Sequence, residues 1–131
     1  MKLYFDHWNK NRDEGSEIEI NSTNVNDIPS YLKRLNQKEF TQISINEKNS
    51  SLMIGGGNKS YVCTFIVGDN EQYFNLVNVK NNSNDDVEVV TGGQGGIFEQ
   101  RIVVELPLAL EAMQYYILNG EKKPELVWDE D

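Results

Sequence analysis

The chain has 131 residues, and its 12 Lys and Arg side chains stand against 21 Asp and Glu, which gives a formal net charge of -9 at pH 7. A chain of this length is expected to form one domain, because chains divide into several domains only above about 250 residues. Apolar residues make up 38% of the sequence and aromatic residues 10%, enough to build a core, which argues against global disorder. The negative charge opposes unaided binding to nucleic acid or anionic lipid, since both need Lys and Arg at the contact.

The start of the chain and its apolar runs bear on where the protein works. A carboxylate, Asp6, follows the first five residues before any signal-type apolar stretch forms, so no secretory signal is predicted. The longest strand-like run, residues 61–67, is far shorter than the roughly 20 apolar residues that cross a bilayer. The single cysteine, Cys63, forms no internal disulfide. We therefore expect a cytoplasmic protein without a membrane span.

The first third of the chain predicts a strand and a helix. Residues 17–20 alternate polar and apolar side chains, which is typical of a strand whose Ile18 and Ile20 face a core. Pro29 marks the first turn of an amphipathic helix. The helix is expected to bury Ile28, Tyr31, Leu32 and Leu35 and to expose Lys33, Arg34 and Gln37.

A run of strands is predicted next. Residues 40–45, with Thr41, Ile43 and Ile45 on one face, form a hairpin with residues 51–54. The glycines at 55–57 with Asn58 predict a turn, and residues 61–67 are apolar on both faces, as in the central strand of a covered sheet. A meander of further strands is expected, separated by turns and by a wide turn or bulge at residues 92–96, over residues 72–79, 87–90 and 97–106.

The last part of the chain predicts a second helix with a clear end. Pro107 opens it, Asn119 and Gly120 end it, and Lys122, Lys123 and Pro124 follow, as is common after a helix C-terminus. Its buried stripe is Ala109, Ala112, Met113, Tyr116 and Ile117, and residues 126–128 form a short final strand. The fold class is therefore α+β: a single domain over residues 1–131, with a largely antiparallel sheet of about seven strands and two amphipathic helices on one face.

Two glycine-rich segments, the single histidine and the single cysteine are candidate parts of a catalytic or nucleotide-binding site, and none has the required pattern. Residues 55–60 lack the Gly before Lys59 that a phosphate-binding loop needs, and a strand follows instead of a helix. Residues 92–96 likewise miss the dinucleotide-binding spacing. His7 is the only histidine, which excludes a catalytic triad and a two-histidine metal site. Cys63, in mid-strand without a nearby base, is expected to be a buried apolar residue.

Three acidic stretches remain as candidates for binding. They satisfy neither the controlled separation of a hydrolytic carboxylate pair nor the oxygen cage of a divalent cation, so no catalytic residue, metal ligand or cofactor is assigned. Any one stretch alone is typical of a solvated loop. Together they suit a domain that binds a basic protein, and their candidate residues are Asp69, Glu71, Asp85, Asp86, Glu88, Asp129, Glu130 and Asp131.

Short motifs follow one another in a set order along nearly the whole chain: Phe5-Asp6-His7-Trp8-Asn9, the glycine turn between central strands, Thr91-Gly92-Gly93, Leu106-Pro107 with Ala109 and Ala112, Gly120, Pro124 and Val127-Trp128. Their order resembles the first-numbered immunity protein family of bacterial polymorphic toxin systems. Members are often encoded beside toxins of the deaminase superfamily. One departure is that this chain has Val89, Val90 and Thr91 where members often carry aromatics before the Gly-Gly pair.

The resemblance implies a non-enzymatic antidote that binds one cognate toxin, one to one, and blocks its active site inside the producing cell. A toxin that acts on nucleic acid needs a basic groove, which an acidic partner can occupy as a charge mimic. The eight acidic candidates are the expected contacts, with Tyr73 as an exposed aromatic anchor. Two alternatives stay open: an acidic module that binds a small ligand or a metal, and an enzyme that uses carboxylates with a metal.

Overall fold

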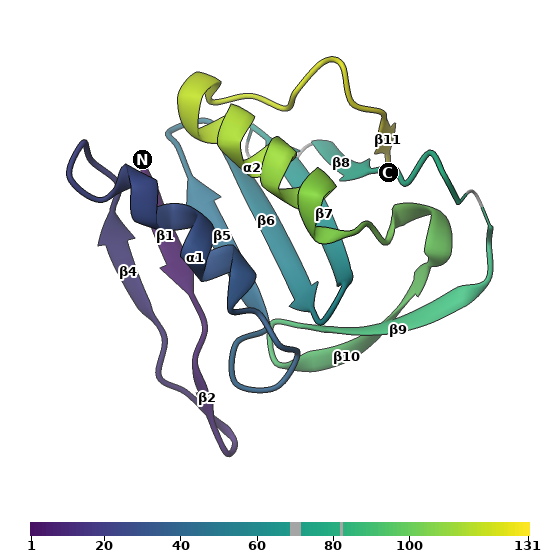
Figure 1. The fold of residues 1–131 in the computed structure, drawn as a ribbon, viewed down its shortest axis with the longest axis horizontal. Coiled ribbons are helices and arrows are strands. Elements are labelled where there is room, and N and C mark those ends of the chain that lie inside the picture. The colour runs from purple at the N-terminus through teal and green to yellow at the C-terminus, as the bar shows by residue number, and fades with distance from the viewer. Residues whose placement is uncertain (69–71, 82) are drawn as a thin grey trace.

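The computed structural model describes residues 1–68, 72–81 and 83–131. Two helices cover one face of an antiparallel sheet, and two short hairpins extend from it (Figure 1). The sheet has seven strands in the order β11 (Trp128–Glu130), β8 (Gln72–Leu76), β7 (Ser60–Val67), β6 (Ser50–Gly57), β5 (Gln42–Asn46), β1 (Lys2–Phe5) and β4 (Ser16–Glu19). The predicted α+β class is confirmed.

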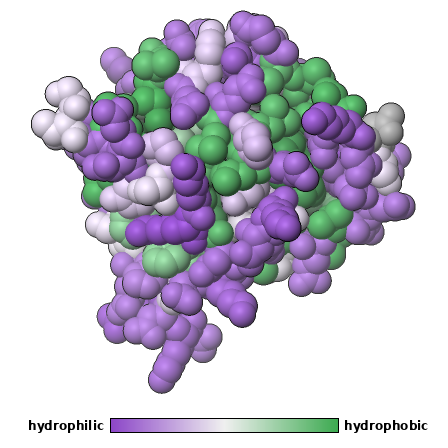
Figure 2. Space-filling view, viewed as in Figure 1, coloured by the Kyte–Doolittle hydropathy of each residue, from purple (hydrophilic) through white to green (hydrophobic). Residues whose placement is uncertain are grey.

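The remaining elements are helices, turns and the two hairpins. The first hairpin projects from the body and is hydrophilic in Figure 2. The second crosses one end of the sheet in Figure 1. These elements are β2 (Trp8–Asn9) with β3 (Arg12–Asp13), β9 (Asp86–Thr91) with β10 (Gln94–Glu99), the helices α1 (Ile28–Lys33) and α2 (Leu106–Asn119), and the 3-10 turns η1 (Val25–Asp27) and η2 (Gln100–Ile102).

The core lies between the helices and the sheet. Antiparallel register places Leu3, Ile45, Leu52 and Phe65 in one row across four strands, all facing the helices. Alternation along each strand puts every second side chain into this layer, because successive side chains point to opposite faces of a sheet. The α2 side chains that pack on the row are fully or nearly fully buried, and they include four of the five predicted: Ala109, Ala112, Met113 and Tyr116.

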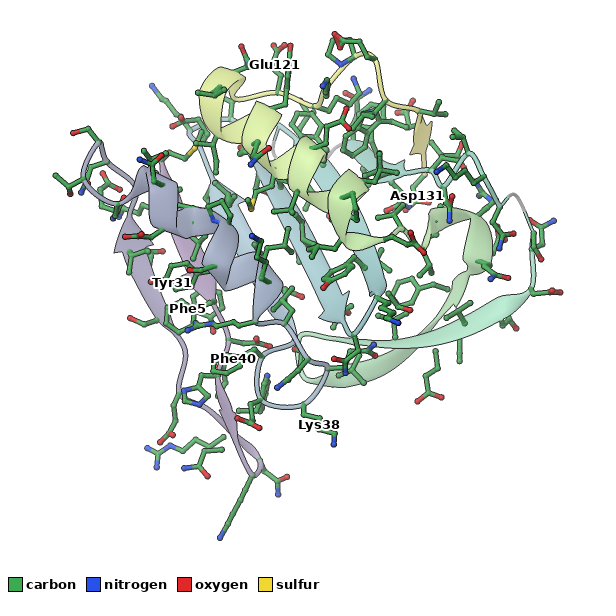
Figure 3. The ribbon with its side chains drawn as sticks, viewed as in Figure 1. Phe5, Tyr31, Lys38, Phe40, Glu121 and Asp131 are labelled. Carbon is green, nitrogen blue, oxygen red and sulfur yellow. The ribbon has the colours of Figure 1, made fainter. Side chains whose placement is uncertain are left out.

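Both helices begin at the predicted prolines, but the chain after α1 differs from expectation. The helix α1 ends at Lys33, Gln37 adopts a positive φ of 63°, and Asn36 forms an isolated antiparallel bridge with Gly57 at the end of β6. The Arg34 guanidinium lies 4.2 to 4.7 Å from the centroids of three rings, those of Phe5, Tyr31 and Phe40, which gather beside α1 in Figure 3. The prediction that Arg34 faces solvent was therefore wrong.

Gln37 was also predicted to be exposed, and it is half-buried. Its amide nitrogen donates to the Gly57 carbonyl at 2.8 Å, and its amide oxygen accepts from the Val90 N–H at 2.9 Å. The side chain thus joins the end of β6 to β9. A residue beyond the end of a short helix contacts whatever the next turn brings near, which helical periodicity does not predict.

Several strand predictions need correction. The glycines at 55–57 lie inside β6, and the turn is made by Asn58 and Lys59, both with positive φ. A Cβ at Gly55 would come within 2.3 Å of Thr91 Cγ2, so the glycine is needed for the close approach of β9. The expected strand over residues 97–106 stops at Glu99, and η2 begins at Gln100. Residues 61–67 were predicted to form the central strand; β7 is an interior strand, but the middle strand of the sheet is β6. β1 was not among the predicted strands.

The second hairpin packs on the face of the sheet opposite the helices. Val62 points to that face, because its neighbours in β7, Tyr61 and Cys63, belong to the helix-side core. Val62 is buried with Val89 of β9 in a separate small cluster. The hairpin therefore covers one end of the far face and leaves the rest of it to side chains that are polar or half-buried.

A buried carboxylate connects this hairpin to the sheet. Asp6 is only 2% exposed, and it accepts hydrogen bonds from the Thr41 N–H (2.7 Å), the Gln42 N–H (3.0 Å), Trp8 Nε1 (2.8 Å) and the Thr41 hydroxyl. The hydroxyl oxygen of Thr41 in turn accepts a hydrogen bond from the Gly93 N–H at 2.9 Å. One carboxylate thus ties the end of β1 and the start of β5 to the turn between β9 and β10.

Replacing Asp6 by Ala is expected to lower the free energy of unfolding by about 3 kcal/mol, because several buried donors lose their acceptor at once. Urea unfolding followed by tryptophan fluorescence measures it. Asp27→Ala is the control: this aspartate is exposed and its side chain caps no backbone N–H, so a change below about 0.5 kcal/mol is expected. Equal effects of the two substitutions would contradict the role assigned to Asp6.

Candidate functional site

The structure brings two of the three predicted acidic stretches together on one side of the molecule. We call this surface the acidic edge. Asp69 and Glu71, the third stretch, lie outside the described residues. Figure 1 shows the start of β9 and the end of β10 on the side where β8 and β11 also lie, and Figure 3 labels Asp131 there. The acidic edge consists of Asp85, Asp86, Glu88, Glu99, Asp129, Glu130 and Asp131.

Arg101 joins the two halves of the acidic edge. Its Nε lies 2.5 Å from Glu99 Oε2 at the end of β10, and its Nη1 donates to Asp129 Oδ2 on β11. The carboxylates of Asp129 and Glu99 raise the pKa of the guanidinium, which stays charged throughout the physiological range. The side chain spans two segments that only the fold brings close, so this ion-pair network sets their relative position.

The backbone around Arg101 is also tied to its neighbours. The Arg101 N–H donates to the Ser83 carbonyl at 3.0 Å, and the Arg101 carbonyl accepts from the Asn78 N–H at 2.7 Å. One residue earlier, the Gln100 N–H donates to the Asp85 carbonyl at 2.9 Å. These bonds hold η2 between the segment after β8 and the segment before β9. The carboxylates on either side are therefore carried on hydrogen-bonded backbone.

The outer face of the β9–β10 hairpin combines charge with one apolar side chain. Register pairs Ile97 with Glu88 and Glu99 with Asp86, so all four side chains lie on the same face. Ile97 is 64% exposed, whereas Val87, Val89 and Phe98 on the other face pack against the sheet. An apolar side chain among carboxylates has the composition of a binding surface with an anchor and a polar rim.

Tyr73, the predicted aromatic anchor, lies next to the acidic edge. Its carbonyl accepts from the Asp131 N–H at 2.9 Å, and its side chain is 37% exposed on the far face of the sheet, opposite Ile66. The sequence does not identify Ile97, Glu99 and Arg101 as site residues, because its apolar pattern predicts one strand over residues 97–106. The signal that would have found them is Glu99-Gln100-Arg101, a charged break in that apolar run.

The other candidate chemistry has structural explanations. His7 stacks on Phe40 with ring centroids 4.7 Å apart. Cys63 is fully buried, and burial raises the pKa of its thiol, which opposes formation of the reactive thiolate. Within residues 1–68, 72–81 and 83–131, no three His, Cys, Asp or Glu side chains converge as metal ligands would.

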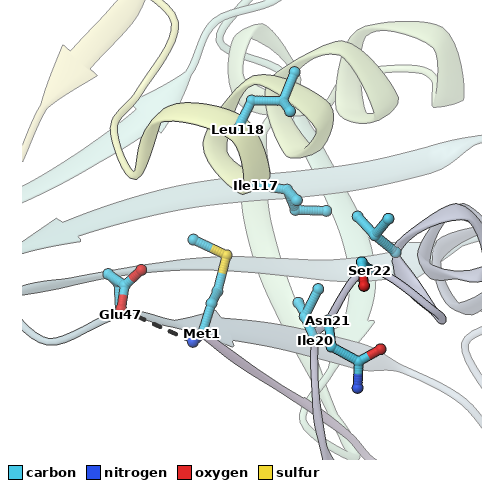
Figure 4. Close-up of a pocket in the computed structure, with 8 residues that line it drawn as sticks. Met1, Ile20, Asn21, Ser22, Glu47, Ile117 and Leu118 are labelled. Atoms are coloured by element: carbon cyan, nitrogen blue, oxygen red, sulfur yellow. Dashed lines mark ion pairs between the residues drawn. The ribbon is translucent and has the colours of Figure 1, made fainter.

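A surface hollow of about 360 Å³ lies between the C-terminal end of α2 and the start of β1 (Figure 4). Its lining is mostly aliphatic, with Ile20, Ile117 and Leu118, and the amino nitrogen of Met1 lies 4.0 Å from Glu47 Oε1 at its rim. The hollow opens widely to solvent, whereas small-molecule sites enclose most of their ligand. It does not favour the small-ligand alternative.

Comparison with known proteins adds no identification. No protein-family model matches the chain, and no curated protein matches it significantly. The immunity-family resemblance therefore stays a prediction. In the part of the chain that the structure describes, no helix is both long and apolar enough to cross a membrane.

The Cys63 thiol is expected to resist a thiol-specific disulfide reagent at about pH 8 in the folded protein and to react as soon as urea unfolds the chain, because labelling requires an exposed thiolate. Absorbance of the released chromophore measures the rate. Rapid labelling in the absence of denaturant would show that Cys63 is accessible and would reopen a nucleophilic role for it.

Proposed function

We propose that the chain is an antidote of the immunity-protein kind, which binds a basic protein toxin one to one and occludes the toxin's active site inside the cell that makes both. The observation that carries the proposal is the acidic edge. Glu99 and Asp129, which are far apart in the sequence, meet at Arg101, and Glu88 lies opposite the exposed Ile97 on the neighbouring strand. This arrangement supports recognition of a complementary basic surface.

The charge balance of the acidic edge supports attraction at a distance. Arg101 compensates for part of the charge of seven neighbouring carboxylates, so the surface remains strongly negative. A toxin that acts on nucleic acid must present Lys and Arg to phosphates, and such a groove attracts an acidic protein through the same charges. The family resemblance adds that the toxin is a deaminase.

The described chemistry favours binding without catalysis. The histidine is stacked on an aromatic ring, the cysteine is buried, and the carboxylates of the acidic edge point outward from a hairpin and a short strand. Outward carboxylates around one aliphatic side chain suit a protein surface, because they remain solvated until a cationic partner arrives. Occlusion of an active site needs only such a surface, held in position.

Reversing two charges, with Asp86→Lys and Glu88→Lys together, is expected to weaken binding of the toxin encoded by the neighbouring gene by at least about tenfold, because both side chains lie on the acidic edge. The control pair, Glu19→Lys with Asp27→Lys, changes the net charge equally at exposed sites remote from it. It is expected to alter affinity by about twofold or less. Surface plasmon resonance with the purified toxin domain measures both, and equal losses would contradict recognition through the acidic edge.

Association with that toxin domain is also expected to slow by about tenfold or more between low and high salt, since steering by charge is screened by ions. Stopped-flow fluorescence measures the association rate. A rate independent of salt would contradict charge steering. Cells that express the neighbouring gene's toxin are expected to grow when this chain is co-expressed. Absence of that rescue would contradict the antidote function itself.

A further inference from the structure

The outer edge of β10 is free to accept another strand. β10 pairs only with β9 among the described strands, and it forms one rim of its two-stranded sheet. The Gly92-Gly93 turn closes the hairpin with Thr91 opposite Gln94. In a two-residue hairpin the residues flanking the turn bond to each other, and the bonding then alternates along the strand. Gly95, Ile97 and Glu99 therefore point their backbone N–H and C=O groups away from β9.

The hydrogen bonds of β9 agree with this alternation. Val90 is opposite Gly95, and its N–H points away from β10 to the side chain of Gln37 at 2.9 Å. On β10 the outward N–H groups of Gly95, Ile97 and Glu99 have no protein acceptor within the described ranges. The strand thus presents a row of three unpaired donors with their adjacent carbonyls, which is the template that an added strand uses.

The two edge strands of the seven-stranded sheet are less suited to pairing. β11 has three residues and β4 has four, whereas β10 has six. Side chains obstruct little of the β10 rim, because two of its residues are glycines, Gly95 and Gly96. Its one large apolar side chain, Ile97, is exposed on the same face as Glu88 and Glu99. Backbone groups for affinity and side chains for specificity thus lie together on β10.

We propose that the edge of β10 binds an extended, basic segment of the partner protein, which adds as a third strand to the β9–β10 sheet. The inference rests on the proposed function and names how the acidic edge holds its partner. Backbone bonds form to Gly95, Ile97 and Glu99, and an apolar partner side chain covers Ile97. Lys or Arg side chains of the segment lie beside Glu99 and extend toward Asp86 and Glu88, which are one strand further away on β9.

The charge of this surface selects a basic partner over a second copy of the chain. Edge-to-edge pairing of two β10 strands would bring the Glu99 carboxylates of both copies, and those of Asp86 and Glu88 one strand further out, into one four-stranded sheet. Like charges across a sheet destabilise pairing, and opposite charges stabilise it. The same carboxylates that repel a second copy attract the Lys and Arg side chains of a cationic strand.

The test uses a capped peptide of alternating Lys and Val residues, long enough to span β10, as the probe. A second peptide of the same sequence is N-methylated at every backbone amide, which removes the donors of both strand edges and keeps the charge. We expect the first to bind at least tenfold more tightly and to shift the NMR amide signals of Gly95, Ile97 and Glu99. Equal binding of both peptides would overturn strand addition while leaving recognition by charge intact, and binding of neither would contradict both.

A pair of variants examines the edge from the protein's side. Ile97→Pro removes an outward N–H without removing a bond to β9, and it is expected to abolish the preference for the unmethylated peptide. Ile97→Val keeps that N–H and is expected to retain the preference. Circular dichroism checks that each variant is folded. If the Ile97→Pro variant is unfolded, the comparison of the two peptides on the unmodified protein tests strand addition. Concentration-dependent dimers that Ile97→Pro dissociates would overturn the proposal in favour of a second copy.

Discussion

The buried carboxylate of Asp6 is the interaction that holds the turn of the β9–β10 hairpin, which carries part of the acidic edge. A carboxylate removed from water is destabilising unless donors surround it, and here two backbone N–H groups, an indole and a hydroxyl do so. Because the same hydroxyl also accepts from Gly93, the network extends from the sheet into the β9–β10 turn. The hairpin is thus held at its turn by polar contacts and along its length by Val62 and Val89.

This attachment couples stability to recognition. Gly55 in β6 leaves room for Thr91, and Gly93 leaves room for the Trp8 ring, whose Cζ2 would lie 2.3 Å from a Cβ at that position. Close packing at the turn fixes the hairpin's direction, so its outer face and free edge have a defined geometry before any partner binds. A preformed surface loses less conformational entropy on association than one that orders during binding.

The acidic edge concentrates like charge, which is unfavourable for the isolated fold. Arg101 relieves part of this repulsion through its contacts with Glu99 and Asp129, and the exposed position of the other carboxylates lets water screen the rest. A cationic partner would relieve the remainder. Charge that opposes folding in the free protein and favours association is consistent with a surface used for binding rather than for support.

The sequence by itself determined the class of fold and most helix limits, because proline, glycine and the period of apolar residues act locally: Pro107 opens α2, and Gly120 ends it with a φ of 71°. It also indicated every carboxylate of the acidic edge except that of Glu99. Only the tertiary structure decided that Arg34 and Gln37 are covered, that β1 lies between β4 and β5, and that Arg101 joins Glu99 to Asp129. These outcomes depend on contacts between segments distant along the chain, which local periodicity does not encode.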